Sequence, residues 1–126
     1  MNIYFSISGL LLFLLSFAHA TWGETKIFKQ LNTDKMGEGT FLNLYVPWHQ
    51  LTYILSLSGV GIILAAFKNE FLPLSYFILA LILGNLLIFT LLCLMRKEIG
   101  LIKQSIPQYF LFILLILLLT LGIVSA

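Results

Sequence analysis

The chain has 126 residues, of which 60% are hydrophobic and only 10% are charged, with a net charge of +2. A soluble domain carries about 25% charged residues, so this chain has too little polar surface to coat a water-facing globule. Its single cysteine, Cys93, forbids an internal disulfide and is most simply a small apolar filler. These numbers exclude a soluble enzyme, a disulfide-rich secreted domain and, for want of a polybasic patch, a nucleic-acid binder.

The charges are unevenly placed along the chain. All twelve fall into three short windows: 24–38, 68–70 and 96–103. The stretches outside these windows are uncharged and 23 to 29 residues long: 1–23, 39–67, 71–95 and 104–126. Crossing a hydrocarbon core of about 30 Å takes about 20 apolar helical residues, so each stretch can span a membrane once.

The continuous apolar runs predict helices, because a helix satisfies its own backbone in lipid whereas a membrane strand alternates in polarity. Proline at the start of a segment favours helix entry and helps to set the boundaries. The predicted helices are Ile3–Ala20, Pro47–Phe67, Phe71–Met95 and Pro107–Val124. The expected fold is an all-α, integral membrane four-helix bundle, a single domain over 1–126 with an antiparallel up-down-up-down order.

The only sizeable predicted loop lies between the first two helices. Its first half, Thr21–Leu31, mixes aromatic and apolar residues with charges, so it is either an interfacial amphipathic helix or an extension of the first helix. Its second half, Asn32–Thr40, is polar and contains glycine, which predicts a flexible loop.

The positive charges predict an orientation. The first and third loops together hold six Lys and Arg residues, whereas the second loop holds only Lys68. Lys and Arg favour the cytoplasm in short loops, so we expect both termini to face outward, as N-out and C-out, in a bacterial inner membrane. Ala18-His19-Ala20 also fits a signal-peptide cleavage site, but Met1-Asn2-Ile3 lacks the positive charge of such a peptide, which favours an uncut first helix.

A polar side chain in an apolar membrane helix costs free energy, so each one needs a structural or functional reason. On the second predicted helix they follow an i, i+3, i+4, i+7 spacing, which places them on one face: His49, Thr52, Tyr53 and Ser56. His19 ends the first helix at the same side of the membrane, and Glu24 follows it closely. We therefore expect one polar cluster at the cytoplasmic end, formed by His19, Glu24 and the residues of this helix face: His49, Thr52, Tyr53 and Ser56.

This cluster has two readings. Imidazole and carboxylate groups can bind Zn, Cu, Fe or haem iron, or pass protons, which would make His19, Glu24 and His49 a metal or redox site. The two histidines lack, however, the further ligands at fixed spacing that typify a metal site. A polar network that locks the first two helices together, with no cofactor and no catalytic residue, is the favoured interpretation.

Small residues predict where helices approach one another closely. Gly61 with Ala65, and Ala80 with Gly84, form small-xxx-small pairs. Asn85 is the most strongly polar side chain deep in a predicted span. We expect it to hydrogen-bond across helices, within the chain or in a homodimer.

The run from His19 to Glu24, followed by Trp48-His49, resembles a group of small four-helix bacterial inner-membrane proteins of unknown function. Members of that group carry His-Ser-x-x-Gly-Glu at the end of the first helix and Trp-His at the start of the second, and Ala20 stands here in place of the serine. The resemblance implies an uncut first helix and a role for Gly23 besides the predicted cluster. It implies no activity.

The sequence thus predicts a non-enzymatic membrane protein that contacts the lipid bilayer and acts by association with itself or with another membrane protein. A metal-handling or redox protein that uses the predicted cluster is the alternative. A small dimeric transporter is less favoured, because no acidic residue sits at mid-membrane depth.

Overall fold

The computed structural model describes residues 1–31 and 33–126 and has an all-α fold. Four helices are long and apolar enough to cross a membrane. These are α1 (Ile3–Trp22), α3 (Glu38–Phe67), α4 (Leu72–Met95) and α6 (Ile106–Val124). Shorter helical segments link them: η1 (Gly23–Ile27), η2 (Phe28–Gln30), α2 (Thr33–Met36), η3 (Asn69–Phe71) and α5 (Ile99–Gln104).

Helix α1 does not end at Ala20, as predicted, but runs to Trp22 and continues without a break as helical turns to Gln30. Segment η1 is a π-helical turn, a wider form that occurs mainly as a local bulge in an α-helix. Of the two alternatives for Thr21–Leu31, the structure therefore has the extension of the first helix.

Helix α3 begins at Glu38 and not at the predicted Pro47, which lies inside it. An interior proline removes one backbone hydrogen bond and costs about 3 kcal/mol, so the sequence favours a helix that starts at this proline. The turns before it are held by ring packing, since both Phe41 and Tyr45 contact Phe28 of η2. These contacts explain why the helix persists on the N-terminal side of the proline.

The predicted flexible loop Asn32–Thr40 is also mostly helical where the structure describes it. Residues 33–36 form α2, and the residues from Glu38 onward belong to α3. Gly37 separates the two helices with a φ of 79°, a left-handed conformation that favours glycine. Asn32 lies outside the described residues.

Helices α1 and α3 contact each other backbone to backbone. A Cβ atom on Gly59 would lie 2.6 Å from the backbone nitrogen of Phe13, and one on Gly9 would lie 2.8 Å from the Gly59 carbonyl oxygen. The two backbones can approach this closely only because neither glycine has a side chain. The sequence prediction missed this crossing.

Of the two predicted small-residue pairs, one lies at a helix interface within the chain and the other does not. Gly61 contacts Leu74 and Ile78 of α4, and Ala65 is buried, so the first pair lies at a helix interface as predicted. The prediction for the second pair is wrong in this chain, because Ala80 is exposed and no described atom lies within 4 Å of a Cβ on Gly84.

Asn2 joins three helices where the chain begins. Its side-chain oxygen accepts a hydrogen bond from the Phe5 N–H at 3.2 Å and so caps α1. Its amide nitrogen donates to the Gly122 carbonyl of α6 at 2.7 Å, and its backbone N–H donates to the Ala66 carbonyl of α3 at 2.8 Å. This junction was not predicted from the sequence.

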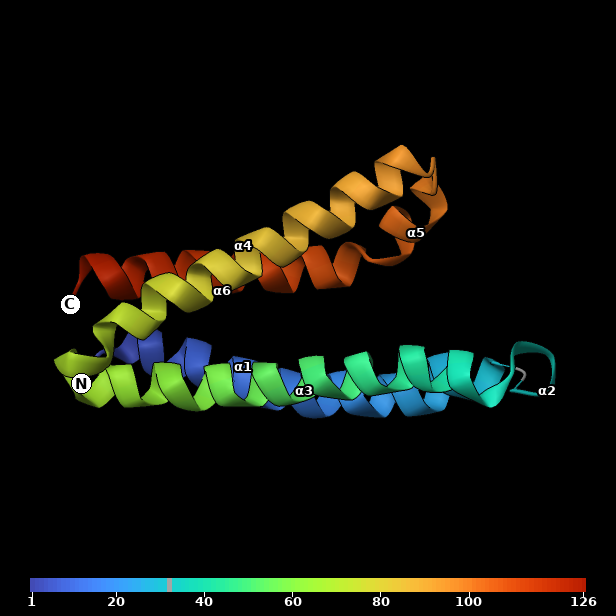
Figure 1. Cartoon of the computed structure of the whole chain (residues 1–126). Coiled ribbons are helices and arrows are strands. Elements are labelled where there is room, and N and C mark those ends of the chain that lie inside the picture. The colour runs from blue at the N-terminus through green and yellow to red at the C-terminus, as the bar shows by residue number, and fades with distance from the viewer. Residues whose placement is uncertain (32) are drawn as a thin grey trace.

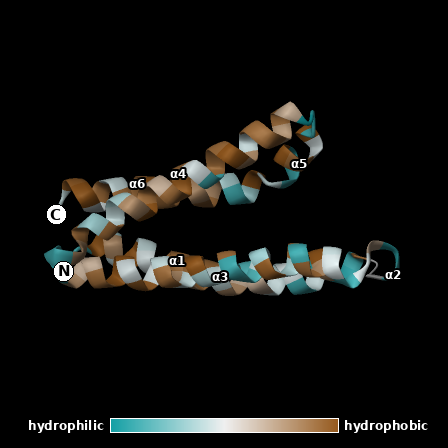
Figure 2. Ribbon diagram, viewed as in Figure 1, coloured by the Kyte–Doolittle hydropathy of each residue, from teal (hydrophilic) through white to brown (hydrophobic). Residues whose placement is uncertain are grey.

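The buried core occupies the end of the molecule near this junction. It is built from side chains of all four long helices: Phe5, Leu12, Ile62, Ala65, Ala66, Ile78, Ile82, Leu115 and Leu119. Figure 1 shows the α1–α3 pair and the α4–α6 pair meeting at the end that carries both termini and diverging toward the end that carries α5. In Figure 2 the hydrophilic residues gather at the ends of the helices, and apolar residues colour most of α4 and α6.

Candidate functional site

Glu24 is the centre of the first group of polar side chains. The π-helical turn η1 carries this carboxylate to α3, where one of its oxygens, Oε1, accepts two hydrogen bonds. The hydroxyl of Tyr45 donates at 2.7 Å and Nε2 of His49 donates at 3.0 Å. Because Tyr45 and His49 are four residues apart on α3, one turn of helix presents both donors to the same carboxylate.

The second group is built on His19, near the end of α1. Its Nδ1 lies 2.9 Å from the hydroxyl of Thr52, which itself donates to the Trp48 carbonyl at 3.2 Å. A hydroxyl has a single hydrogen, so when Thr52 donates it to Trp48 it can only accept from His19. With Thr52 donating in this way, the contact requires a proton on Nδ1 of His19.

Trp48 connects the two groups. Its indole ring stacks on the imidazole of His19, with centroids 4.1 Å apart and planes at 13°, and its Nε1 donates to the His19 carbonyl at 3.2 Å. Since Trp48 precedes His49 directly, the backbone of α3 holds the His19 group beside the Glu24 group.

Gly23 makes this arrangement possible. A Cβ atom on Gly23 would collide with the indole nitrogen of Trp48, so any larger residue would push α1 and α3 apart at this level. The resemblance implied that Gly23 matters, and the structure gives a steric reason.

Phe28 closes the site on the other side. Its ring packs against four aromatic rings of α3, with centroids 4.9 to 6.3 Å away: Phe41, Tyr45, Trp48 and His49. Edge-on and offset aromatic pairs of this kind are favourable beyond their buried area. Phe28, Tyr45 and Trp48 were not among the predicted site residues, because aromatic residues near a membrane surface are common without any specific role.

Six residues were predicted for the polar cluster, and the structure divides them. Glu24 bonds to His49, and His19 bonds to Thr52. Tyr53 is exposed, and in the described part of the chain neither its hydroxyl nor that of Ser56 has a hydrogen-bond partner. The site is thus two adjacent pairs linked by Trp48, rather than one cluster of six.

The metal hypothesis for His19, Glu24 and His49 finds no matching ligand geometry. Over residues 1–31 and 33–126, no three or more His, Cys, Asp or Glu side chains are grouped so that they could hold a metal ion. Cys93 is buried in α4. The Glu24–His49 and His19–Thr52 pairs can hold α1 against α3, and the imidazole and carboxylate of the first pair can exchange a proton.

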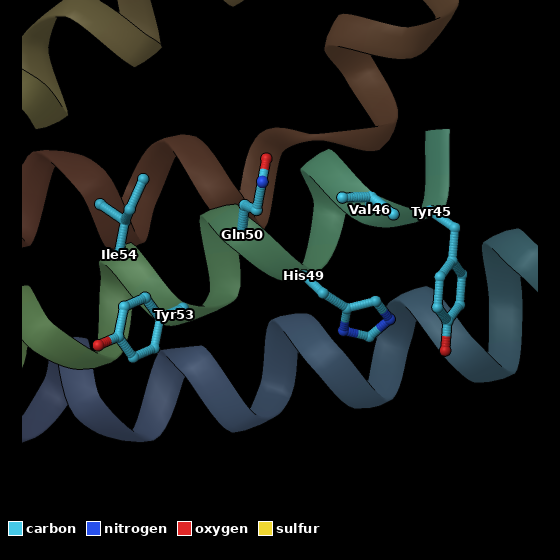
Figure 3. Close-up of a pocket in the computed structure, with 6 residues that line it drawn as sticks. All are labelled: Tyr45, Val46, His49, Gln50, Tyr53 and Ile54. Atoms are coloured by element: carbon cyan, nitrogen blue, oxygen red, sulfur yellow. The ribbon is translucent and has the colours of Figure 1, made fainter. Parts of the chain in front are cut away.

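A shallow groove of about 660 Å³ runs along α3 beside this site. Its walls come from two rows of α3: Tyr45, His49 and Tyr53 in one, and Val46, Gln50 and Ile54 in the other. Figure 3 shows the first row extending over α1 and the second row on the side of α3 away from α1. The side chains of His49 and Glu24 are 34% and 47% exposed, so this hydrogen-bonded pair is accessible from the surface of the protein.

Comparisons of this chain with protein-family models, with curated proteins and with solved structures find no match. The resemblance to small four-helix inner-membrane proteins therefore remains a prediction.

Proposed function

We propose that this chain is a multi-pass protein of the bacterial inner membrane that acts by association with itself or with a partner membrane complex, and not by catalysis. Four helices of sufficient length and hydropathy support four membrane spans. Successive contacts support an antiparallel first pair, since Asn2 lies against Ala66 and Gly23 against Trp48. Large exposed apolar side chains occur on all four long helices and suit a lipid environment.

The proposed orientation places both termini outside. Both termini lie at one end of the molecule, and α2 and α5, which lie in the two Lys- and Arg-rich loops, are at the other (Figure 1). The preference of Lys and Arg for the cytoplasm carries the orientation itself. In chains with one introduced cysteine, a membrane-impermeant thiol reagent should label position 68 from outside and leave positions 35 and 97 unlabelled. Labelling of position 35 from outside would contradict this orientation.

One observation carries the association proposal. The α3 groove leaves the side chains of Gln50 and Tyr53 exposed, and neither has a hydrogen-bond partner in the part of the chain that the structure describes. In a bilayer, a polar group without a partner costs several kcal/mol, so these side chains favour a protein neighbour over lipid.

Mass determination of the protein released directly from native membrane vesicles tests association. We expect complexes that contain the 14.3 kDa chain together with at least one more polypeptide, its own copy or another. Release of single 14.3 kDa chains alone, under conditions that preserve a known membrane dimer as a control, would contradict the proposal.

A further inference from the structure

A second cavity extends the groove along α3. It has a volume of about 220 Å³ and lies between α3 and α4. Its lining comes from both helices: Ile54, Leu57, Ser58, Gly61, Leu74, Phe77, Ile78 and Leu81. Ile54 also lines the first groove, so the two hollows are neighbours along α3, and together they are called the α3–α4 groove below.

Asn85 continues the α4 wall of this groove. It follows Leu81 by four residues and Ile78 by seven, and both spacings place it on the same side of the helix. Its amide nitrogen donates one hydrogen bond, to the Leu81 carbonyl at 2.9 Å, and its side chain is exposed. Its second N–H and its oxygen have no partner among the described residues.

The opposite wall carries polar groups as well. Gln50 and Ser58 lie one turn to either side of Ile54 on α3, and neither side chain has a hydrogen-bond partner in the part of the chain that the structure describes. Asn85 follows Phe71 by 14 residues, and Ile54 precedes Lys68 by 14, so Asn85 lies near the level of Ile54 along the paired helices. Lipid tails could bond none of these three polar groups.

We infer that a second copy of this chain fills the α3–α4 groove, with the two copies related by a two-fold axis along the membrane normal. Asn85 of each copy bonds to Asn85 of the partner copy. This inference rests on the proposed membrane insertion.

Three features fit a second copy as the occupant of the groove. Copies inserted in the same direction hold Asn85 at the same depth, and an amide is both donor and acceptor, so two of them satisfy each other. The groove lining contains no Lys, Arg, Asp or Glu and is mostly apolar. Beyond Asn85, α4 continues with apolar side chains, and those of Ile88 and Leu92 are more than half exposed.

Disulfide formation between copies tests this contact. In full-length chains that carry Cys93→Ser, Asn85→Cys and Ile88→Cys should oxidise to covalent dimers in native membranes. Leu87→Cys is the matched control, because Leu87 and Ile88 are equally exposed, at 60%, but Leu87 lies on the opposite side of α4 from Asn85. It should remain monomeric.

Two results would overturn the inference. One is a Leu87→Cys chain that forms dimers as readily as Asn85→Cys. The other is a lack of dimers at positions 85 and 88 in chains whose topology labelling shows the proposed orientation. A chain that fails the topology labelling contradicts the proposed function instead, so the two failures are distinguishable.

Energy transfer between labelled copies in vesicles gives a second readout. Asn85→Leu should raise the dimer dissociation constant about 5- to 30-fold, the effect of losing interhelical amide hydrogen bonds in a bilayer. Asn85→Gln keeps a donor and an acceptor and should restore most of the affinity. An unchanged dissociation constant for Asn85→Leu would contradict the role of the amide.

Discussion

Individual residues decide how α1 and α3 meet at the polar site. His19, Glu24 and His49 were recognisable in the sequence because charged and imidazole groups stand out in an apolar chain. The stacking of Trp48 on His19 was not, because it depends on the relative positions of two helices. A sequence alone also does not reveal that a glycine faces an indole ring.

The steric role of Gly23 predicts the effect of a single methyl group. Gly23→Ala should destabilise the protein by about 1–3 kcal/mol, because the indole of Trp48 is already held by the stacked His19 ring and cannot shift freely. Unfolding in mixed micelles measures the loss, and the fluorescence of Trp48 in a Trp22→Phe background reports displacement of the ring.

Gly39→Ala is the control for this substitution. Gly39 lies in the first turn of α3, and no described atom is within 4 Å of its Cβ position. The change should be neutral or raise stability by up to about 1 kcal/mol. Equal losses at positions 23 and 39 would show that the contact with Trp48 is unimportant.

The hydrogen-bond network predicts the tautomer of His19. Nitrogen NMR should find neutral His19 protonated on Nδ1 in the native protein, because Thr52 can only accept there. Thr52→Val removes the acceptor with little change in shape and should shift the proton toward Nε2. Ser56→Ala, one turn further along α3 and outside this network, should leave the spectrum of His19 unaltered; a native Nε2-protonated ring would refute the assignment.

At the scale of the helices, the four apolar segments were predictable because the charges delimit them. The start of α3 was not, because Pro47 marks a helix entry in most sequences and only contacts with Phe28 extend the helix beyond it. The α1–α3 crossing was missed for a related reason. Small-xxx-small patterns are sought within one helix, whereas here one glycine comes from each of two helices, Gly9 and Gly59.

This crossing predicts a contrast between two glycines. Gly59→Ala should cost about 1–3 kcal/mol, because the added Cβ would meet the backbone of Phe13, which cannot rotate away. Gly84→Ala should be neutral or stabilising, since the space beside Gly84 holds no described atom within 4 Å and alanine is the better helix former. Unfolding of both variants in mixed micelles makes the comparison, and a larger loss at position 84 would contradict the observed packing.

At the scale of the whole molecule, the all-α fold with four long apolar helices followed from composition and charge. The divergence of the two helix pairs did not, because a leucine that faces lipid and one that faces a helix read alike in a sequence. Asn85 shows the same ambiguity. Its sequence position predicted a bond across helices, yet within the chain its one hydrogen bond returns to its own helix.

The proposed function requires that protein covers the α3 groove in the membrane. A photoreactive amino acid at position 50 in the groove tests it in living cells, with Leu14, an exposed residue of α1 that lines neither cavity, as the control position. We predict protein adducts at position 50, at the mass of two chains if the partner is a second copy, and mainly lipid adducts at position 14. Lipid adducts alone at position 50 would contradict the claim.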